Sequence, residues 1–115
     1  MFWYISSPYS KFPGGLDAAY ELACEARGLL IKAGIPCFSP IAHSHGTAKL
    51  CGIDPRDHSI WLPVEAPIMA AAHGIIMLKA ESWETSYGMY KELKAFQATG
   101  KPVVWMNPGE LPIFP

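Results

Sequence analysis

Short apolar runs alternate with stretches of helical period along the chain. The apolar, aromatic and β-branched residues 2–6 predict a buried first strand, which stops at Ser7-Pro8 because proline forces the preceding residue into an extended conformation. Apolar positions spaced by three and four over residues 16–33 predict a helix that ends at Gly34. Residues 35–38 then predict a second strand.

The pattern is less regular in the middle of the chain. Residues 39–57 are rich in Pro, Gly, His and Ser and show no clear period, so they predict a long functional loop that either contains a short helix or lines a binding site. Residues 59–72 predict a helix whose regular part starts late, because it contains Pro63 and Pro67. Strands are expected over residues 74–78 and 102–106, on either side of a helix over 85–99 that Gly100 closes.

The alternation of strands and helices favours right-handed crossovers and a parallel sheet covered on both faces. We expect one α/β domain over residues 1–115, with three layers and a four- to five-stranded parallel sheet of the flavodoxin or Rossmann-like type. In such folds, ligands bind where the carboxyl ends of the strands meet the N-termini of the helices.

Composition narrows the possible partners. Half of the 115 residues are hydrophobic and 17% are charged, with a formal net charge of -1 and no basic run, which argues against polymeric nucleic acid as a partner. A single nucleotide stays possible, because one phosphate needs only a few donors at a helix N-terminus. No apolar run approaches the roughly 20 residues that span a bilayer, so no membrane partner is expected. The three cysteines form no CxxC pair and no signal-peptide pattern is present, so a cytoplasmic location is expected.

Glu92 is the candidate for a catalytic carboxylate. On the helix over residues 85–99 it falls about 60° to one side of the core stripe, and it leans back toward Gly88 one turn earlier. A glycine costs roughly 1 kcal/mol in a helix interior relative to alanine, so Gly88 suggests that space near Glu92 is needed. Ser86 lies in the first turn, where its hydroxyl and the free N–H groups could hold a phosphate or sugar oxygen.

A purely structural interpretation of the same residues stays open. Ser86 or Thr85 could simply cap the helix, Gly88 could fit a close contact between helix and sheet, and Glu92 could pair with a lysine. Trp83 could either stack on a base or close the edge of the sheet. A metal site can be imagined from the histidines near residues 43–58 and Cys51, but their spacing matches no common zinc pattern, so we expect no metal and no cofactor.

Three segments of the chain, residues 4–10, 83–92 and 100–104, resemble the nucleoside 2-deoxyribosyltransferase superfamily, and the resemblance extends over the whole chain. Within that superfamily the sequence is most similar to small bacterial and phage proteins of the DUF1937 type. These share the Ser-Pro-Tyr-Ser start at residues 7–10 and a Phe-Ser-Pro-x-x-x-Ser-His segment like residues 38–45. The resemblance implies the superfamily's α/β fold.

The resemblance also implies an activity and roles for three residues. Relatives of known activity exchange or hydrolyse the N-glycosidic bond of 2-deoxynucleosides or their 5′-monophosphates through a glutamate nucleophile, here Glu92. Tyr4 matches a tyrosine that orients this nucleophile, although a strand tyrosine could also be only a core aromatic. Glu65 matches the position of an aspartate that contacts the sugar or assists the leaving base.

Further positions follow from the same resemblance. Ser7, Pro8, Ser44 and His45 are expected to contact the nucleoside or nucleotide, and a homo-oligomer is expected as in the relatives. The glutamate at position 65 is one methylene longer than the family's aspartate, and a misplacement near 1 Å can change a rate about 100-fold. This substitution, together with His73 at the position of a second family acid, motivates an alternative, a non-catalytic nucleotide-binding or partner-binding module of the same fold.

Overall fold

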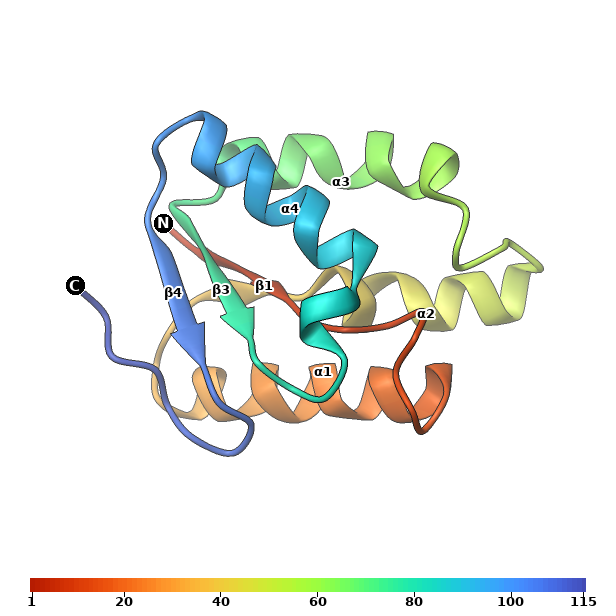
Figure 1. The fold of residues 1–115 in the computed structure, drawn as a ribbon, viewed down its shortest axis with the longest axis horizontal. Coiled ribbons are helices and arrows are strands. Elements are labelled where there is room, and N and C mark those ends of the chain that lie inside the picture. The colour runs from red at the N-terminus through yellow and green to blue at the C-terminus, as the bar shows by residue number, and fades with distance from the viewer.

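The computed structural model describes all 115 residues, with a four-stranded parallel sheet between layers of helices (Figure 1). Every residue of the two central strands is buried, as expected for a sheet covered on both faces. The spatial order of the strands is β2-β1-β3-β4. In chain order they are β1 (Trp3–Ser6), β2 (Cys37–Phe38), β3 (Gly74–Leu78) and β4 (Val103–Met106).

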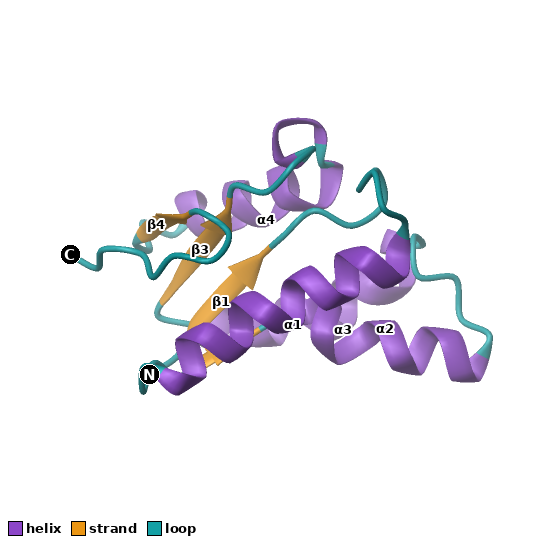
Figure 2. Ribbon diagram, turned by 90° about the horizontal axis from the view of Figure 1, so that it is seen from below, coloured by secondary structure: helices purple, strands orange, loops and turns teal.

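Helices cover both faces of this sheet, so the predicted three-layer α/β architecture is confirmed (Figure 2). The helix α1 packs against one face, while α3 and α4 contribute buried side chains to the other. A short 3₁₀ turn, η1, precedes α4. The helical bounds are α1 (Leu16–Lys32), α2 (Pro40–Cys51), α3 (His58–Ala71), η1 (Trp83–Thr85) and α4 (Tyr87–Ala98).

Alternation along β1 divides its side chains between the two layers. Trp3 and Ile5 belong to the core under α1, whereas Tyr4 belongs to the core under α3 and α4. Ser6 follows Tyr4 by two residues and therefore faces the α4 layer as well. The ring of Trp3 fits because β3 begins with Gly74, where a Cβ atom would lie only 2.6 Å from Trp3 Cζ3.

The order of the strands creates a switch point between β1 and β3. The chain leaves β1 through α1 to β2 on one side, and later reaches β3 on the other side of β1. At such a point the connections after the two strands diverge and leave a crevice beyond their carboxyl ends, where ligands bind in open α/β sheets. The segment after β1 and the start of α4 after β3 flank this crevice.

The long loop predicted over residues 39–57 is wrong in its extent, because most of this segment is α2, while the alternative that the segment contains a helix is confirmed. Ser39 caps the helix by accepting a hydrogen bond at Oγ from Ala42 N at 3.1 Å, and Pro40 occupies the first turn. Gly52 ends the helix in the left-handed conformation at φ 67°. The capping residues at both ends therefore define this helix, although the apolar period between them is weak.

The late start predicted for the next helix was also wrong, since α3 begins at His58. Asp57 caps it through hydrogen bonds to Oδ1 from Ser59 N at 3.0 Å and Ser59 Oγ at 2.6 Å. Trp61 Nε1 donates to Asp54 O at 2.9 Å and fixes the first turn. Pro63 and Pro67 lie inside the helix, so each removes one backbone hydrogen bond without ending it.

The remaining elements agree with the sequence within a few residues. The strand over residues 74–78 has the predicted bounds, while β2 is shorter and α4 begins at Tyr87 because Ser86 caps it. Beyond β4 the chain turns back, and Phe114 packs on the ring of Trp3 at a centroid distance of 5.0 Å. None of the helices has the length and apolar character required to cross a membrane.

Candidate functional site

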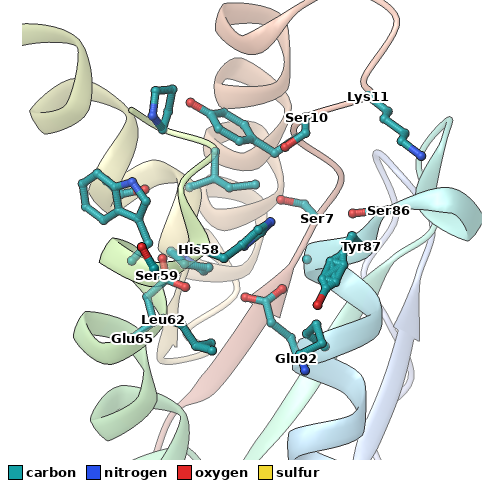
Figure 3. A pocket seen from close by; sticks show the side chains of 18 residues that line it. Ser7, Ser10, Lys11, His58, Ser59, Leu62, Glu65, Ser86, Tyr87 and Glu92 are labelled. Atoms are coloured by element: carbon teal, nitrogen blue, oxygen red, sulfur yellow. The ribbon is translucent and has the colours of Figure 1, made fainter. Parts of the chain in front are cut away.

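A cavity of about 390 Å³ lies at the crevice beyond the carboxyl ends of β1 and β3 (Figure 3). The segment after β1 and the helices α2, α3 and α4 supply its walls, so residues far apart in the sequence meet there. Six of the residues selected from the sequence line this cavity. They are Ser7, Ser44, Glu65, Ser86, Gly88 and Glu92.

Two hydroxyl groups of β1 hold the carboxylate of Glu92. Tyr4 Oη donates a hydrogen bond to Glu92 Oε2 at 2.8 Å, and Ser6 Oγ donates to Glu92 Oε1 at 2.7 Å. Since both oxygens are engaged, the plane and direction of the carboxylate are fixed. No lysine pairs with Glu92, which excludes the ion-pair interpretation. The contact with Tyr4 agrees with the orienting role that the resemblance implies.

A second carboxyl group, that of Glu65 on α3, lies close to the hydroxyl of the same tyrosine. Glu65 Oε2 lies 3.4 Å from Tyr4 Oη, and Figure 3 shows Glu65 and Glu92 on helices to either side of β1. A phenol carries one proton, so the shorter bond to Glu92 uses it. The contact between Glu65 and Tyr4 is then a hydrogen bond only when Glu65 is protonated, because its carboxyl group can donate to the oxygen of Tyr4. The order Glu65, Tyr4, Glu92 forms a chain of hydrogen bonds directed toward Glu92.

Burial sets the protonation of this chain. It raises the pKa of Glu92 from 4.5 to about 7, against the opposing effect of the hydrogen bonds from Ser6 and Tyr4, and the charge of Glu65 raises it further. Burial likewise raises the pKa of Glu65 to about 7, and the single bond from Tyr4 opposes this. Burial, followed by the two carboxylates, raises the pKa of Tyr4 far above its ordinary value, so the phenol stays a donor. Near neutral pH, the carboxyl groups of Glu65 and Glu92 therefore share one proton.

Ser6 is a site residue that the sequence interpretation missed. The sequence feature that could have identified Ser6 is the alternation of side chains along the first strand, which places it on the same face as Tyr4. Ser6 is fully buried, and its hydroxyl has the carboxylate as its partner.

Replacing Ser6 by alanine should raise the pKa of Glu92 above its present value of about 7, because one of the two bonds that favour the ionised form is lost. Titration of Glu92 followed by carbon NMR measures this change. Ser10→Ala, on the cavity wall without a contact to Glu92, is the matched control. An unchanged titration in Ser6→Ala would contradict the assigned hydrogen bond.

At the start of α4, Ser86 fits both interpretations that the sequence left open, a helix cap and a residue of the binding site. Ser86 Oγ accepts from Met89 N at 3.3 Å, so this residue does cap the helix while it also lines the cavity. Gly88 is not in a tight contact between helix and sheet, because the atom nearest to an added Cβ would be His58 Cε1 at 3.8 Å. Gly88 instead keeps part of the cavity wall free of side-chain atoms.

Replacing Gly88 by alanine should leave the fold intact and stabilise the helix by up to about 1 kcal/mol, since no atom clashes with the new methyl group. The methyl group projects into the cavity and should weaken binding of any ligand that fills it. Gly28→Ala is the matched control, because Gly28 lies inside α1, has open space around it and does not line the cavity. Thermal melts and binding isotherms of both variants separate the two effects, and equal binding would show that the space is not used.

Polar groups suited to an anion lie on the wall of the same cavity. Ser7 is buried, its Oγ has no hydrogen-bond partner, and it lines the cavity with the first residues of α4. Lys91 and Lys11, the second of which is labelled in Figure 3, add two positive charges to the wall. Free N–H groups at a helix start, a hydroxyl and ammonium groups together suit an anionic group such as a phosphate.

Four of the residues selected from the sequence do not line this cavity: Tyr4, which reaches it only through Glu65 and Glu92, and three others. Pro8 is fully buried within the segment after β1. Trp83 packs edge to face on Trp105 of β4 at 5.3 Å, which supports the sheet-edge alternative for this residue. His45 is buried in α2 and bonds to Tyr9 and Asp17. No group of three or more His, Cys, Asp or Glu side chains is arranged to hold a metal ion.

Comparison with known proteins adds a family match. A family model described as a domain of unknown function (DUF1937) matches residues 2–108. No curated protein matches the chain. The matched range includes all the residues that form the cavity and the hydrogen-bonded chain of Glu65, Tyr4 and Glu92.

Proposed function

Because the chain belongs to the DUF1937 family, whose function is unknown, we propose an activity from the site itself. We propose that the protein is an N-glycosidase or deoxyribosyltransferase that acts on a 2-deoxynucleoside or its 5′-monophosphate through Glu92. The observation that carries this proposal is a fixed carboxylate at a nucleoside-sized cavity, joined through Tyr4 to a second carboxyl group. The resemblance of residues 83–92 to nucleoside 2-deoxyribosyltransferases supports the same reaction.

In the first step, an oxygen of Glu92 attacks the anomeric carbon of the deoxyribose. The new C–O bond forms as the bond to the base nitrogen breaks, and the electron pair leaves with the base. The base takes a proton from the carboxyl group of Glu65, which becomes a carboxylate. The products of this step are a free base and a deoxyribosyl ester of Glu92.

In the second step, water or a second base attacks the anomeric carbon from the side that the first base left. Glu65 removes the proton of the incoming nucleophile, and the ester bond breaks to restore the carboxylate of Glu92. Tyr4 and Ser6 stabilise this carboxylate when it leaves. Water gives hydrolysis, and a second base gives transfer.

The polar groups of Ser7, Lys11 and Lys91 on the cavity wall favour the 5′-monophosphate over the free nucleoside. A phosphate at the start of α4 would satisfy Ser7 Oγ, which is buried without a partner, and would pair with Lys91 or Lys11. The sugar would then lie between the phosphate and Glu92. We propose no metal and no cofactor in this reaction.

The rate should depend on pH as a bell-shaped curve with its maximum near pH 7, because Glu92 must be ionised while Glu65 is protonated. Glu65→Gln should lower base release by about 100-fold and remove the fall on the alkaline side. Initial rates from pH 5 to 9 measure both. An alkaline limb that persists in Glu65→Gln would contradict the role of Glu65 as the acid.

The direct test of the activity is a panel of 2-deoxynucleosides and their 5′-monophosphates, with released base followed by chromatography. Release by the wild-type protein, lost in Glu92→Ala, supports the proposal. Absence of release from every compound, or equal release by Glu92→Ala, rejects it.

The alternative is a nucleotide-binding module without turnover. It is motivated by the side chain at position 65, a glutamate that is longer than the family's aspartate. Calorimetry with the same panel separates the two. Binding of a nucleotide without release of its base supports the module, whereas no binding of any nucleotide rejects both.

A further inference from the structure

A second hydrogen-bonded chain reaches the cavity through Tyr9, and the proposed reaction does not use it. Tyr9 Oη lies 2.7 Å from His45 Nδ1, and His45 Nε2 lies 2.8 Å from Asp17 Oδ1. The imidazole is buried, and the ring of Tyr20 stacks on it at a centroid distance of 4.7 Å. Lys49 Nζ lies 3.4 Å from both oxygens of Asp17. Residues of α1 and α2 thus fix the position of Tyr9.

The chemistry of these groups determines which atom carries each proton. An ionised carboxylate only accepts hydrogen bonds, and the bonds from His45 and Lys49 lower the pKa of Asp17 and keep it ionised. His45 Nε2 must therefore carry a proton and donate it. In a neutral imidazole the other nitrogen is then bare, so Nδ1 accepts from Tyr9. With the imidazole neutral, the single proton of the Tyr9 hydroxyl therefore points at His45.

Tyr9 lines the main cavity. It also lines a second, smaller cavity, whose wall includes Asp17, His45 and Lys49. A tyrosine hydroxyl usually turns to suit its neighbour and can donate or accept. Here its proton is committed to His45, so only the lone pairs of Oη remain for a ligand in the main cavity. A ligand atom that faces this oxygen must bring its own proton.

We propose that Tyr9 is a specificity residue, held by His45 and Asp17 as an acceptor, which selects bases that carry an amino group over bases that carry an oxo group at the same ring position. This inference rests on the proposed function, because it assumes that a nucleoside fills the cavity. An amino group donates to Tyr9 Oη, whereas an oxo group places two acceptors against each other. His45 and Asp17 act through Tyr9 and are positioning residues.

The expected discrimination is about tenfold, the size of one net hydrogen bond. It is measured as the ratio of dissociation constants within two matched pairs, the 5′-monophosphates of 2-deoxyadenosine and 2-deoxyinosine, and of 2-deoxycytidine and 2-deoxyuridine. The measurement uses Glu92→Gln, in which turnover does not consume the ligand. The amino member of at least one pair should bind about tenfold tighter.

Three substitutions in this background test the cause of the ratio. Tyr9→Phe keeps the ring and should bring the ratio close to one. Asp17→Asn can donate from its amide to His45 Nε2, which moves the imidazole proton to Nδ1 and frees the Tyr9 proton for the cavity, so the preference should shift toward the oxo member. Lys49→Met removes the other partner of Asp17 without changing the direction of any proton, and it should leave the ratio unchanged.

The outcomes separate this inference from the proposed function. If nucleotides bind with a ratio that Tyr9→Phe and Asp17→Asn leave unchanged, the role of Tyr9 is wrong while the proposed function stands. If neither the wild-type protein nor Glu92→Gln binds any nucleotide, both are wrong. A loss of affinity in Asp17→Asn that is equal for the two members of a pair would show only a structural role and would also overturn the inference.

Discussion

Replacing Glu92 by glutamine is expected to lower release of the base at least about 1000-fold, because the amide is nearly the same size but cannot attack the anomeric carbon. The amide oxygen can still accept a hydrogen bond from Tyr4 or Ser6, so the cavity should keep its shape. Single-turnover measurements at pH 7 with the best substrate of the panel give the rate. The circular dichroism spectrum checks the fold.

Glu84 offers the matched control for this substitution. It lies exposed on η1 outside the cavity, so Glu84→Gln should change the rate by less than about twofold. A Glu92→Gln variant that keeps more than about a tenth of the wild-type rate would contradict the assignment of Glu92 as nucleophile.

The wild-type protein should be less stable at pH 8 than at pH 5, by about 3 kcal/mol from Glu92 alone. The pKa of Glu92 is 4.5 in the unfolded chain and about 7 in the fold, so the folded state binds this proton more tightly. Between these two values the unfolded chain releases the proton first, and the free energy of unfolding falls as the pH rises. Glu65 acts in the same direction with a smaller effect, because it is less buried and water screens its charge.

Denaturant unfolding at pH 5, 6, 7 and 8 measures this dependence. Glu92→Gln should flatten the curve and be more stable than the wild type at pH 8, while Glu84→Gln should follow the wild type. The lowered pKa of Asp17 affects stability only below its ordinary value near 3.8, outside this range. Wild-type stability that rises from pH 5 to 8 would show that Glu92 is not held in a buried site.

A carboxylate that is unfavourable for stability and needed for turnover is typical of a catalytic site. The sequence indicated this residue through two independent signals, its place beside the core stripe of α4 and its resemblance to a known nucleophile. Tyr4 was predicted to orient it, and the two lie 2.8 Å apart. The fold class followed from the alternation of strands and helices, which depends on local apolar periods that one sequence contains.

The errors concern α2 and the residues that tertiary contacts position. The buried residues Ile41, His45 and Ala48 follow a helical spacing, but one of them is a histidine, so the apolar period was not recognised. Only the contacts with Tyr9 and Asp17 from other elements show why a histidine is buried there. The same holds for Trp83, whose partner Trp105 is on a strand that follows it in the chain.

Ser6 and the cavity illustrate a third limit. A serine at the end of a buried strand gives no sign of its partner, because Glu92 reaches it from a helix 86 residues later. The capping interpretation of Ser86 and the ligand interpretation are compatible, although the sequence presented them as alternatives. Local patterns thus predicted the elements, while the pairing of Glu65 with Glu92 through Tyr4 required the fold.

The most direct test of Glu92 as a nucleophile is mass spectrometry of the protein quenched in acid during turnover of a 2-deoxynucleoside 5′-monophosphate. We predict that the peptide containing Glu92 carries 5-phosphodeoxyribose as an ester of the Glu92 carboxylate, and that this ester is absent from Glu92→Gln. An unmodified peptide during turnover, or a sugar attached to another residue, would contradict it.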